Sequence, residues 1–282
     1  MYEDILTEGS VAVVTGGAAG IGLAAAKTFA ERGLSVCIAD LGADRLAAAA
    51  EQLAAVAPKG NGAVMTSATD VSQRSQLEAL EAAVQDRFGG TDILMNNAGI
   101  QTGSALFGPV ENWERVFSVN LWGVIHGTQV FVPKMLDRGR PGLVVNTGSK
   151  QGITTPPGDP AYNVAKAGVK VFTEALAHEL RGTGKPLSAH LLIPGFVFTE
   201  LTSRGRADKP DGAWTSEQTV AFMFERLAEG DFYILCPDND VSRAVDERRI
   251  SWAAADIVEN RSALSRWDPK YSDAFAKYMA AP

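Results

Sequence analysis

The sequence predicts an α/β fold in which one doubly wound, mostly parallel sheet carries helices on both faces. Two patterns support this prediction. Short apolar runs alternate with stretches of helical periodicity, and several runs are apolar without a break, as in strands covered on both faces. Such alternation favours parallel strands joined by right-handed crossovers. The expected strands are Val11–Thr15, Ser35–Ala39, Ala63–Thr66, Ile93–Asn96, Leu143–Thr147, Leu187–Ile193 and Phe232–Cys236.

The hydrophobic content limits the number of domains. The chain has 282 residues, of which 46% are hydrophobic, and this is enough for one full-sized core. We therefore predict a single domain over residues 1–282. Residues 196–230 form an insertion before the last strand, and residues 240–282 form a C-terminal extension. The helices between the strands are expected at Ile21–Arg32, Asp44–Val56, Ser72–Phe88, Trp113–Leu136 and Ala161–Arg181.

The charge and the apolar pattern argue against two classes of partner. The formal net charge is −7 and the isoelectric point is about 5.1, so nucleic acid and anionic lipid would both be repelled. No apolar run approaches the roughly 18 residues of a membrane-spanning helix, and Met1–Ser10 is acidic where a signal peptide is basic. Cys37 and Cys236 are expected as buried reduced thiols. These features predict a cytoplasmic protein that binds neither nucleic acid nor a membrane.

A glycine-rich segment opens the first helix directly after the first strand. Gly16, Gly20 and Gly22 follow the spacing Gly-x-x-x-Gly-x-Gly. Gly16 would permit a tight turn, Gly20 would let the backbone approach a pyrophosphate, and Gly22 would let the helix pack closely on the strand. The positive end of the helix would then face the phosphates. The strand before and the helix after favour a dinucleotide site over an ordinary turn.

Asp40 ends the second strand, where a carboxylate can accept hydrogen bonds from the hydroxyls of an adenosine ribose. It would repel the 2′-phosphate of NADP, and neither Gly17 nor Leu41 is a basic residue that could offset this repulsion. We therefore predict NAD in preference to NADP. The alternative is that Asp40 only caps the following turn. Asp70, after the third strand, could bind the adenine amino group or cap the next helix.

Tyr162 and Lys166 are four residues apart at the start of an expected helix, so their side chains share one face. A tyrosine with its usual pKa near 10 is a poor base at neutral pH. The ammonium, together with the positive charge of an oxidised nicotinamide, would stabilise the phenolate and lower this pKa. The tyrosine could then exchange a proton with an alcohol or carbonyl oxygen. Taken alone, such a pair is more typical of a surface; Ser149, at a strand end, favours the catalytic interpretation because it could hold the same oxygen.

These motifs together resemble those of a known family. From about Gly9 to Thr199 the chain resembles the short-chain dehydrogenase/reductase family, with the matches in the family's order. The resemblance implies a Rossmann fold, and it implies that the insertion at residues 196–230 is the mobile lid over the substrate. The matching segments are Thr15–Gly22, Asp70, Asn96–Gly99, Asn120, Ser149, Tyr162 with Lys166, Pro194–Gly195 and Thr199.

The resemblance implies roles for four catalytic residues. Tyr162 is expected to be the acid/base, and Ser149 to orient the reacting oxygen. Lys166 is expected to lower the tyrosine pKa and to hold the nicotinamide ribose, and Asn120 to support a water-linked proton relay to Lys166. The hydride chemistry would belong to the cofactor, while the protein supplies orientation and charge.

The resemblance also implies a set of cofactor-binding residues. Thr199 and the backbone near Val197 are expected to hold the nicotinamide carboxamide, and Asn97–Gly99 to support the cofactor after the fourth strand. The complete set is Gly16, Gly20, Ile21, Gly22, Asp40, Asp70, Val71, Asn97, Ala98, Gly99, Tyr162, Lys166, Pro194, Gly195, Val197 and Thr199. No metal is expected, because the three histidines have no Cys, Asp or Glu at ligand spacing.

The segment after Ser149 departs from the family pattern. Lys150 and Gln151 stand where the family commonly has small or apolar residues, which makes them candidates for substrate contact together with Phe196. A lysine at a strand end is more often simply solvated. The chain also lacks the Asp-Gly-Gly ending that is typical of the family's fatty-acid-type reductases.

Two classes of function remain open at this point. The first is an enzyme that transfers a hydride between NAD(H) and a secondary alcohol or ketone, with an NADP-linked carbonyl reductase as its variant. The second is a dinucleotide-binding sensor without chemistry. The set Asn120, Ser149, Tyr162 and Lys166 favours the enzyme, because a sensor does not need it.

The resemblance and the apolar pattern lead to two predictions beyond the active site. In the family, the helices at Trp113–Leu136 and Ala161–Arg181 pack against their copies, so a homodimer or homotetramer is expected, with Trp122 and Phe172 at the interface. The extension has apolar residues near helical spacing over residues 241–260. We expect this stripe, with Trp252, to pack on Phe222–Phe224 of the insertion and to wall a pocket for a bulky, partly apolar substrate.

Overall fold

Seven strands form one sheet whose order places a crevice at the carboxyl ends of the central strands. The computed structural model describes residues 5–203 and 205–281; residues 1–4, 204 and 282 lie outside this description, as do those parts of the predicted ranges 1–282, 196–230 and 240–282. The strands are β1 (Val11–Thr15), β2 (Ser35–Asp40), β3 (Val64–Ala68), β4 (Ile93–Asn96), β5 (Gly142–Thr147), β6 (Leu187–Ile193) and β7 (Tyr233–Leu235). Their order is β3-β2-β1-β4-β5-β6-β7. It reverses between β1 and β4, which is where open α/β sheets bind their ligands.

The predicted α/β class and all seven predicted strands are confirmed, with one correction. Every neighbouring pair is parallel, so the sheet is wholly and not mostly parallel. Strands β1, β4 and β5 are buried along their whole length. This is why their sequences are continuous apolar runs and not alternating ones.

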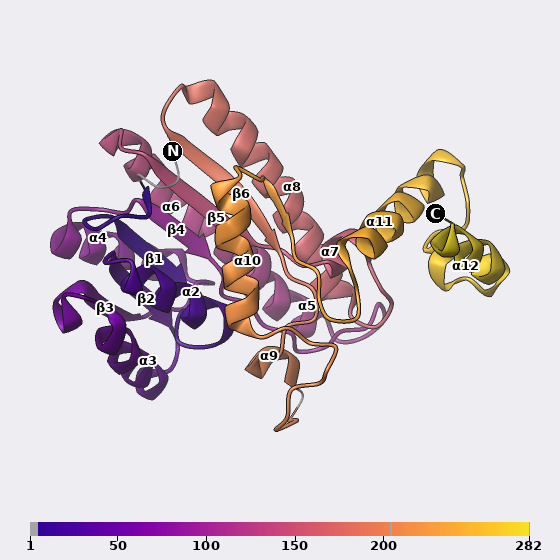
Figure 1. The fold of residues 1–282 in the computed structure, drawn as a ribbon, viewed down its shortest axis with the longest axis horizontal. Helices are drawn as coiled ribbons and strands as arrows, with labels where there is room; N and C mark the ends of the chain where they lie inside the picture. The colour runs from indigo at the N-terminus through magenta and orange to yellow at the C-terminus, as the bar shows by residue number, and fades with distance from the viewer. Residues whose placement is uncertain (1–4, 204, 282) are drawn as a thin grey trace.

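Helices cover both faces of the sheet (Figure 1). One face carries α2 (Gly20–Glu31), α3 (Ala43–Val56) and α10 (Ser216–Ala228). The other carries α4 (Arg74–Phe88), α6 (Gly123–Arg138) and α8 (Pro160–Thr183). Successive strand residues point to opposite faces, so the β1, β4 and β5 side chains divide between two apolar cores.

The predicted helix Trp113–Leu136 is confirmed as one unbroken helical stretch, with a part in its middle that is not α-helical. It consists of α5 (Val110–Phe117), a π-helical segment at Ser118–Trp122, and α6. The π-helical segment turns Asn120 inward, where it is fully buried and hydrogen-bonded to the loop after β4. Hydrophobic periodicity does not reveal such a widened turn, and π-bulges of this kind are frequent at functional sites.

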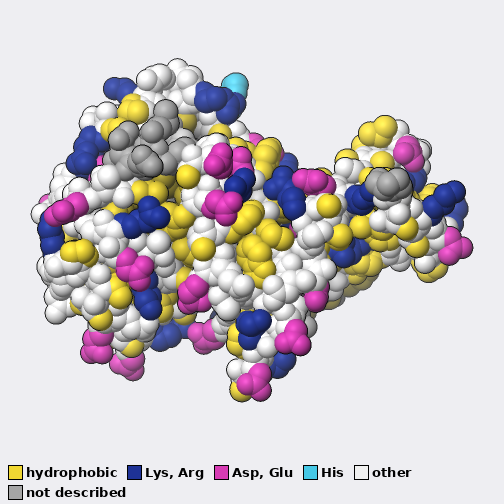
Figure 2. Space-filling model, viewed as in Figure 1, with side chains coloured by type: hydrophobic (Ala, Val, Ile, Leu, Met, Phe, Trp, Pro, Cys, Tyr) yellow, Lys and Arg dark blue, Asp and Glu magenta, His cyan; other side chains and the backbone are white. Residues whose placement is uncertain are grey.

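The C-terminal extension forms an arm that stands away from the body (Figures 1 and 2). It consists of α11 (Arg243–Val258), two short 3₁₀ turns at Ser265–Trp267 and Pro269–Tyr271, and α12 (Ser272–Ala280). The expected helix in residues 241–260 is therefore present. Its apolar stripe is only partly buried: Ile257 and Val258 are 85% and 84% exposed.

The prediction that Phe222–Phe224 meet this helix is wrong. Phe224 lies edge-to-face on Phe29 of α2, with 5.3 Å between ring centroids, and Met223 is buried in the same core. Phe222 packs on Trp214. The arm instead builds its own aromatic cluster, in which Trp252 contacts Phe275 and Tyr278 at 5.2 Å. Apolar side chains pack on the nearest apolar surface in space, which periodicity alone does not identify.

Both cysteines and the membrane prediction can be placed on this fold. Cys37 and Cys236 are free thiols inside the core, and burial raises the pKa of each to about 12 because it disfavours the thiolate. Across the described ranges 5–203 and 205–281, no helix combines the length and the apolar character needed to cross a bilayer.

Candidate active site

A cavity of about 430 Å³ lies at the carboxyl ends of β1, β4 and β5 and brings together most of the predicted site residues. It joins residues from across the chain, from the glycine segment after β1 to the loop after β6. The predicted residues that line it are Gly16, Gly20, Ile21, Asp40, Asp70, Val71, Asn97, Ala98, Gly99, Ser149, Tyr162, Lys166, Pro194, Gly195, Val197 and Thr199.

The glycine segment forms a tight turn at the start of α2. Gly16 has φ +62°, and a Cβ there would lie 2.8 Å from the Cα of Ala98. Gly22 does not line the cavity; a Cβ there would lie 2.2 Å from the Gly16 carbonyl oxygen. Gly22 therefore serves the close packing expected of it and not direct ligand contact.

Thr15 and Asn97 bind the loops after β1 and β4 to each other. The Thr15 hydroxyl accepts hydrogen bonds from the backbone N–H groups of Asn97 (3.0 Å) and Ala98 (3.2 Å). The Asn97 amide donates in return to the carbonyl oxygens of Thr15 and Gly16. Asn97 thus fixes the wall of the cavity through the protein backbone.

Asp40 lies at one end of the cavity and holds the glycine turn. Its carboxylate accepts the N–H of Ala18 at 3.1 Å and that of Leu41 at 2.8 Å. The Arg45 guanidinium lies 3.6 Å from the same carboxylate and 2.8 Å from that of Glu200. Arg45 was not among the predicted site residues, because it lies outside Gly17 and Leu41, the two positions where a basic residue was expected to matter. The signal that could have found it is its place in the first turn of α3, whose start follows the end of β2.

Ser149, Tyr162 and Lys166 converge at the other end. Pro160 at the first position of α8 starts the helix that carries Tyr162 and Lys166. The Ser149 side chain lies close enough to Tyr162 to favour its phenolate. Lys166 is 4% exposed, and its ammonium donates to the Thr147 carbonyl oxygen at 2.7 Å and lies 5.8 Å from the centre of the Tyr162 ring.

In the chain without a cofactor, burial is the main influence on the protonation of Tyr162 and Lys166. It raises the pKa of Tyr162 to about 12; the Ser149 side chain opposes this effect, and the negative charge of Asp159 adds to it. Burial also lowers the pKa of Lys166 to about 8. The net direction for the tyrosine is opposite to the predicted lowering, because desolvation outweighs the stabilisation of its phenolate.

Asn120 and Asp70 support the loops that border the cavity. The Asn120 amide donates to the Ile100 carbonyl oxygen and accepts from the Ile100 N–H, both at 2.8 Å. It does not line the cavity itself, so the expected water-linked relay to Lys166 stays a prediction. Asp70 lines the cavity, and its carboxylate also accepts the N–H of Ser72 at 2.9 Å. It does not cap the next helix, α4, which begins at Arg74 after Gln73.

The three residues proposed for substrate contact lie outside the cavity lining. The Lys150 ammonium points to the carboxylates of Asp238 and Asp246, at 3.2 and 2.6 Å. The Phe196 N–H donates to Asp238. Gln151 begins the short helix α7 (Gln151–Thr154), and its N–H donates to the Ser149 hydroxyl at 3.2 Å. Their role in substrate binding stays a prediction.

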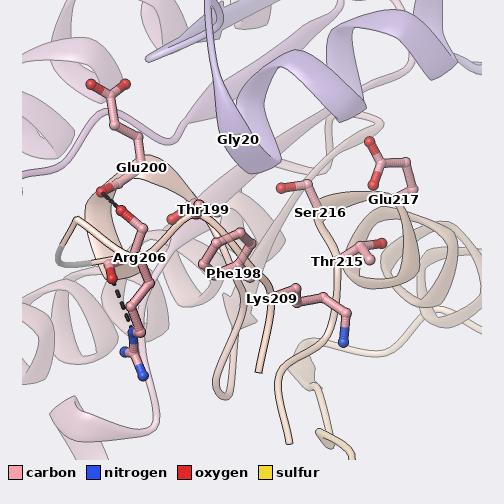
Figure 3. A pocket seen from close by; sticks show the side chains of 11 residues that line it. Gly20, Phe198, Thr199, Glu200, Arg206, Lys209, Thr215, Ser216 and Glu217 are labelled. Carbon is pink, nitrogen blue, oxygen red and sulfur yellow. Dashed lines mark hydrogen bonds between the residues drawn. The ribbon is translucent and has the colours of Figure 1, made fainter. Parts of the chain in front are cut away.

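A second cavity, of about 540 Å³, is lined in part by the short helix α9 (Glu200–Ser203) (Figure 3). Gly20, Thr199 and Glu200 border both cavities. The Arg45–Glu200 ion pair joins α9 to α3.

Within residues 5–203 and 205–281, no group of three or more His, Cys, Asp or Glu side chains could hold a metal ion. Besides Arg45, the sequence analysis missed cavity-lining residues that carry no motif. These include Ile100, Val119, Leu201 and Thr202.

Known proteins show the same architecture and sequence pattern. The family model for short chain dehydrogenases matches residues 10–210. D-beta-hydroxybutyrate dehydrogenase of Rhizobium meliloti is 33% identical over 74% of this chain and 80% of its own length. 1-deoxy-11-beta-hydroxypentalenate dehydrogenase of Streptomyces exfoliatus is 34% identical over 86% of this chain and 88% of its own length.

A solved structure agrees with both results. It is a short chain dehydrogenase/reductase from Burkholderia phymatum in complex with NAD, with a TM-score of 0.81, 32% identity, and coverage of 90% of this chain and 96% of its own. The fold, the motifs and these matches lead to one conclusion. The chain belongs to the short-chain dehydrogenase/reductase family and is an oxidoreductase that acts on CH–OH groups or the corresponding carbonyls.

Proposed function

We propose that this enzyme oxidises a secondary alcohol to a ketone with NAD, with Tyr162 as the acid/base. The observation that carries the proposal is the convergence of Ser149, Tyr162 and Lys166 in the cavity that also holds the glycine turn. A sensor would need the glycine turn without the other three groups.

The residues that line the cavity are of the kinds that NAD would need. The backbone at Gly16, Gly20 and the start of α2 would hold the pyrophosphate, Asp40 the adenosine ribose, and Lys166 the nicotinamide ribose. Val197 and Thr199 would hold the carboxamide, with Pro194 and Gly195 behind it. NAD, when bound, accepts the hydride and brings a positive charge to the ring.

The side chains of the chain would then handle the proton. Ser149 donates a hydrogen bond that holds the substrate oxygen, and Tyr162 removes the proton from that oxygen. The buried phenol has a pKa of about 12 in the chain alone. A nearby positive charge favours the phenolate, so we expect the tyrosine to become basic only in the complex with the oxidised cofactor. Asn120 would keep the loop at Ile100 in place and support the relay to Lys166.

Two opposite charges lie at the end of the cavity where the adenosine ribose would bind, and they act in opposite directions on the choice between NAD and NADP. Asp40 would repel a 2′-phosphate, whereas Arg45 would attract it. Arg45 is already paired with Glu200 at 2.8 Å and lies 3.6 Å from Asp40. We propose that this pairing leaves Asp40 as the deciding charge. An NADP-linked carbonyl reductase is the alternative.

The walls of the cavity support a partly apolar substrate. Ile100, Val119, Val197 and Leu201 line it together with Ser149 and Tyr162. The two curated relatives are named for different hydroxyl-bearing substrates. We propose residues 196–203 and 205–215 of the predicted insertion as the lid, since its helix α10 is packed into the core.

The test is a panel of secondary alcohols, aliphatic, aromatic and acidic, assayed with NAD and with NADP by the formation of reduced cofactor. Turnover of at least one alcohol with a higher kcat/KM for NAD supports the proposal. A higher kcat/KM for NADP would establish the carbonyl reductase instead. Cofactor binding without turnover of any alcohol or ketone would favour the sensor.

We also propose that the enzyme is a homodimer or homotetramer. Trp122 is 50% exposed, and Val164 and Val171 on α8 are 49% and 62% exposed. Exposed apolar side chains on neighbouring helices are typical of a self-association surface. Phe172, by contrast, packs partly on its own core. Light scattering should give a dimer or tetramer, and Trp122→Asp should shift it towards the monomer; a wild-type monomer at assay concentration would refute this part.

A further inference from the structure

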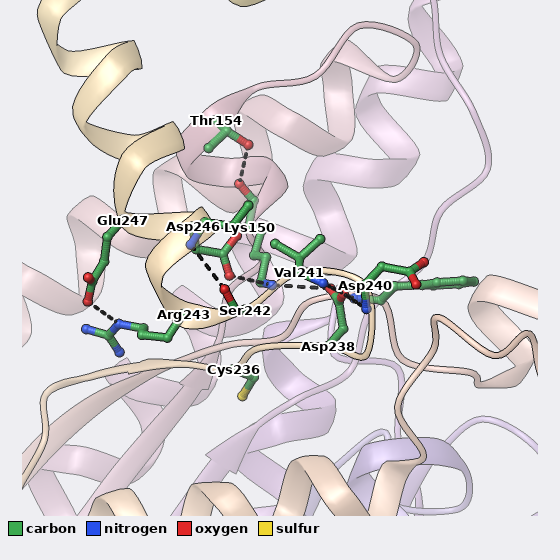
Figure 4. A network of polar contacts seen from close by, with 12 residues as sticks. Lys150, Thr154, Cys236, Asp238, Asp240, Val241, Ser242, Arg243, Asp246 and Glu247 are labelled. Carbon is green, nitrogen blue, oxygen red and sulfur yellow. Dashed lines mark hydrogen bonds and ion pairs between the residues drawn. The ribbon is translucent and has the colours of Figure 1, made fainter. Parts of the chain in front are cut away.

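Lys150, Asp238 and Asp246 form an ionic cluster (Figure 4). It lies against the turn at residues 194–196, where Asp238 accepts the N–H of Phe196. The Lys150 ammonium is 3.2 Å from the Asp238 carboxylate and 2.6 Å from that of Asp246. Both carboxylates are 5% exposed and the lysine side chain is 15% exposed. The partly buried Lys150 ammonium therefore faces two buried carboxylates, and the positive charge of Arg249 also acts on Asp246. Buried charges of this kind are costly unless each is well paired.

Asp238 is held in place by the backbone around it. One of its oxygens accepts the N–H groups of Asp240 and Val241, and the other accepts the N–H of Phe196 at 3.1 Å. The carboxylate thus connects the loop after β7 to the loop after β6. Its position is fixed by hydrogen bonds that remain when the ammonium is removed.

The cluster packs tightly against the turn at residues 194–196. The Lys150 N–H donates to the Pro194 carbonyl oxygen at 3.3 Å. A Cβ on Gly195 would lie 2.5 Å from the Asp238 carboxylate and 2.7 Å from the Lys150 ammonium. Pro194 and Gly195 also line the cavity, together with Ser149. Lys150, the residue after Ser149, therefore sets the distance between Ser149 and the turn at residues 194–196.

Asp246 brings the arm into the same cluster. It lies in the first turn of α11, a helix whose start is capped by Ser242. The Lys150 side chain reaches it from the beginning of α7, and α11 packs on α7 at this point. A change in the position of the arm would therefore act on the ammonium that packs against Gly195.

We propose that Lys150, Asp238 and Asp246 form a positioning cluster that holds the turn at residues 194–196 where the nicotinamide must bind, and that this position depends on the C-terminal arm through Asp246. The proposal rests on the proposed function, because it takes this turn as part of the nicotinamide site. None of the three residues touches the reacting atoms. Their effect is on the distance between cofactor and substrate, to which hydride transfer is sensitive.

The test compares Lys150→Met, Lys150→Arg and Asp246→Asn with the control Lys59→Met, which removes an ammonium from an exposed ion pair with Glu8. The readouts are kcat, KM for NAD, the primary deuterium isotope effect, and the fluorescence of bound NADH. We expect Lys150→Met to lose about 10- to 100-fold in kcat, as when a residue that orients a catalytic group is removed. KM for NAD should change much less, because the adenosine end is intact.

The other variants separate positioning from stability. The isotope effect should rise and the NADH fluorescence should shift in Lys150→Met, whereas Lys150→Arg should recover much of the loss. Asp246→Asn should change kcat, the isotope effect and the NADH fluorescence in the same direction but by less. If Lys150→Met does not fold, Asp246→Asn tests the positioning role in its place. A lower melting temperature with unchanged kcat, isotope effect and NADH fluorescence would overturn the proposal.

Failure of the proposed function would give a different pattern of results from failure of the positioning cluster. In that case the wild type and Lys59→Met would also lack NAD-dependent turnover. The fluorescence of bound NADH needs no substrate, so it would still show whether the cluster positions the nicotinamide.

Discussion

The cavity edge of the sheet and the C-terminal arm hold their residues by different means. Strands β1, β4 and β5 are buried along their whole length, and the loops that follow them are joined by the hydrogen bonds of Thr15, Asn97 and Asn120. In the arm, α11 buries Asp246 and Trp252, and α12 buries no residue completely. The body therefore holds the residues of the cavity by its own contacts, whereas the arm reaches them through the packing of Ile250 on the body and the ion pair of Asp246 with Lys150.

The largest effect should come from the proton-transferring group in the body. Tyr162→Phe removes the phenolic proton and leaves the ring, so we expect a loss of about 10²–10⁴-fold in kcat with nearly normal NADH binding. The control is Tyr233→Phe, at a half-exposed tyrosine that bonds to Glu174. A Tyr162→Phe enzyme that kept about a tenth of the wild-type rate would exclude Tyr162 as the acid/base.

A substitution in the arm should unfold the arm and spare the body. Trp252 contacts Phe275 and Tyr278, has the Arg261 guanidinium over its ring at 3.9 Å, and donates to the Ser265 hydroxyl. Trp252→Ala should cost about 3–5 kcal/mol of local stability. Hydrogen exchange should then speed up in residues 243–280 and stay unchanged in β1 and β4.

The matched control for this experiment is Trp267→Ala, in the same arm. Trp267 is 36% exposed, so its loss should have a much smaller effect. If Trp252→Ala accelerated hydrogen exchange equally in the arm and in the body, the two would fold as one unit. This result would contradict the difference between arm and body.

The preference for NAD over NADP should depend on the charge of Asp40. Asp40→Ala removes the proposed acceptor for the ribose and the proposed repulsion of a 2′-phosphate, while Arg45 remains. We expect the ratio of kcat/KM for NAD over NADP to fall about 10- to 100-fold, since a hydrogen bond to a charged group contributes about 1.5–3 kcal/mol. Asp44→Ala, on the exposed first turn of α3, is the control. An unchanged ratio would show that Asp40 only holds the turn.

The smallest expected effect is a change in the tyrosine pKa with the charge of the cofactor. In the chain alone, burial raises the Tyr162 pKa to about 12. A positive charge close by stabilises the phenolate, so the pKa with NAD should be about one to three units below that with NADH. Carbon-13 NMR of labelled tyrosines measures it, with Tyr162→Phe to assign the signal among the five tyrosines. Equal values would remove the proposed role of the oxidised ring.

The sequence predicted the body well because its signals are local. Buried parallel strands are continuous apolar runs, and Gly16, Asp40, Ser149 and Tyr162 stand at strand ends or helix starts that the topology brings to one edge. A spacing along the chain is then also a spacing in the site.

Features that depend on contacts between distant segments could not be predicted in this way. Arg45 and Glu200 meet across the cavity from helices far apart in the chain. Trp252 packs on Phe275 and Tyr278 instead of the insertion, and the Lys150 ammonium is neutralised by two carboxylates from beyond β7. Periodicity shows that a face is apolar or charged and does not show what will cover it.

The central claim, that this cavity transfers a hydride between a secondary alcohol and NAD, can be tested by following the transferred atom. The wild-type enzyme is incubated with NAD and an alcohol, chosen from the panel, that carries deuterium on its carbinol carbon. NMR of the recovered cofactor then locates the label. We predict deuterium at C4 of the nicotinamide, on one face of the ring, in an amount equal to the ketone formed. Ketone formation with no deuterium at C4 would contradict the account.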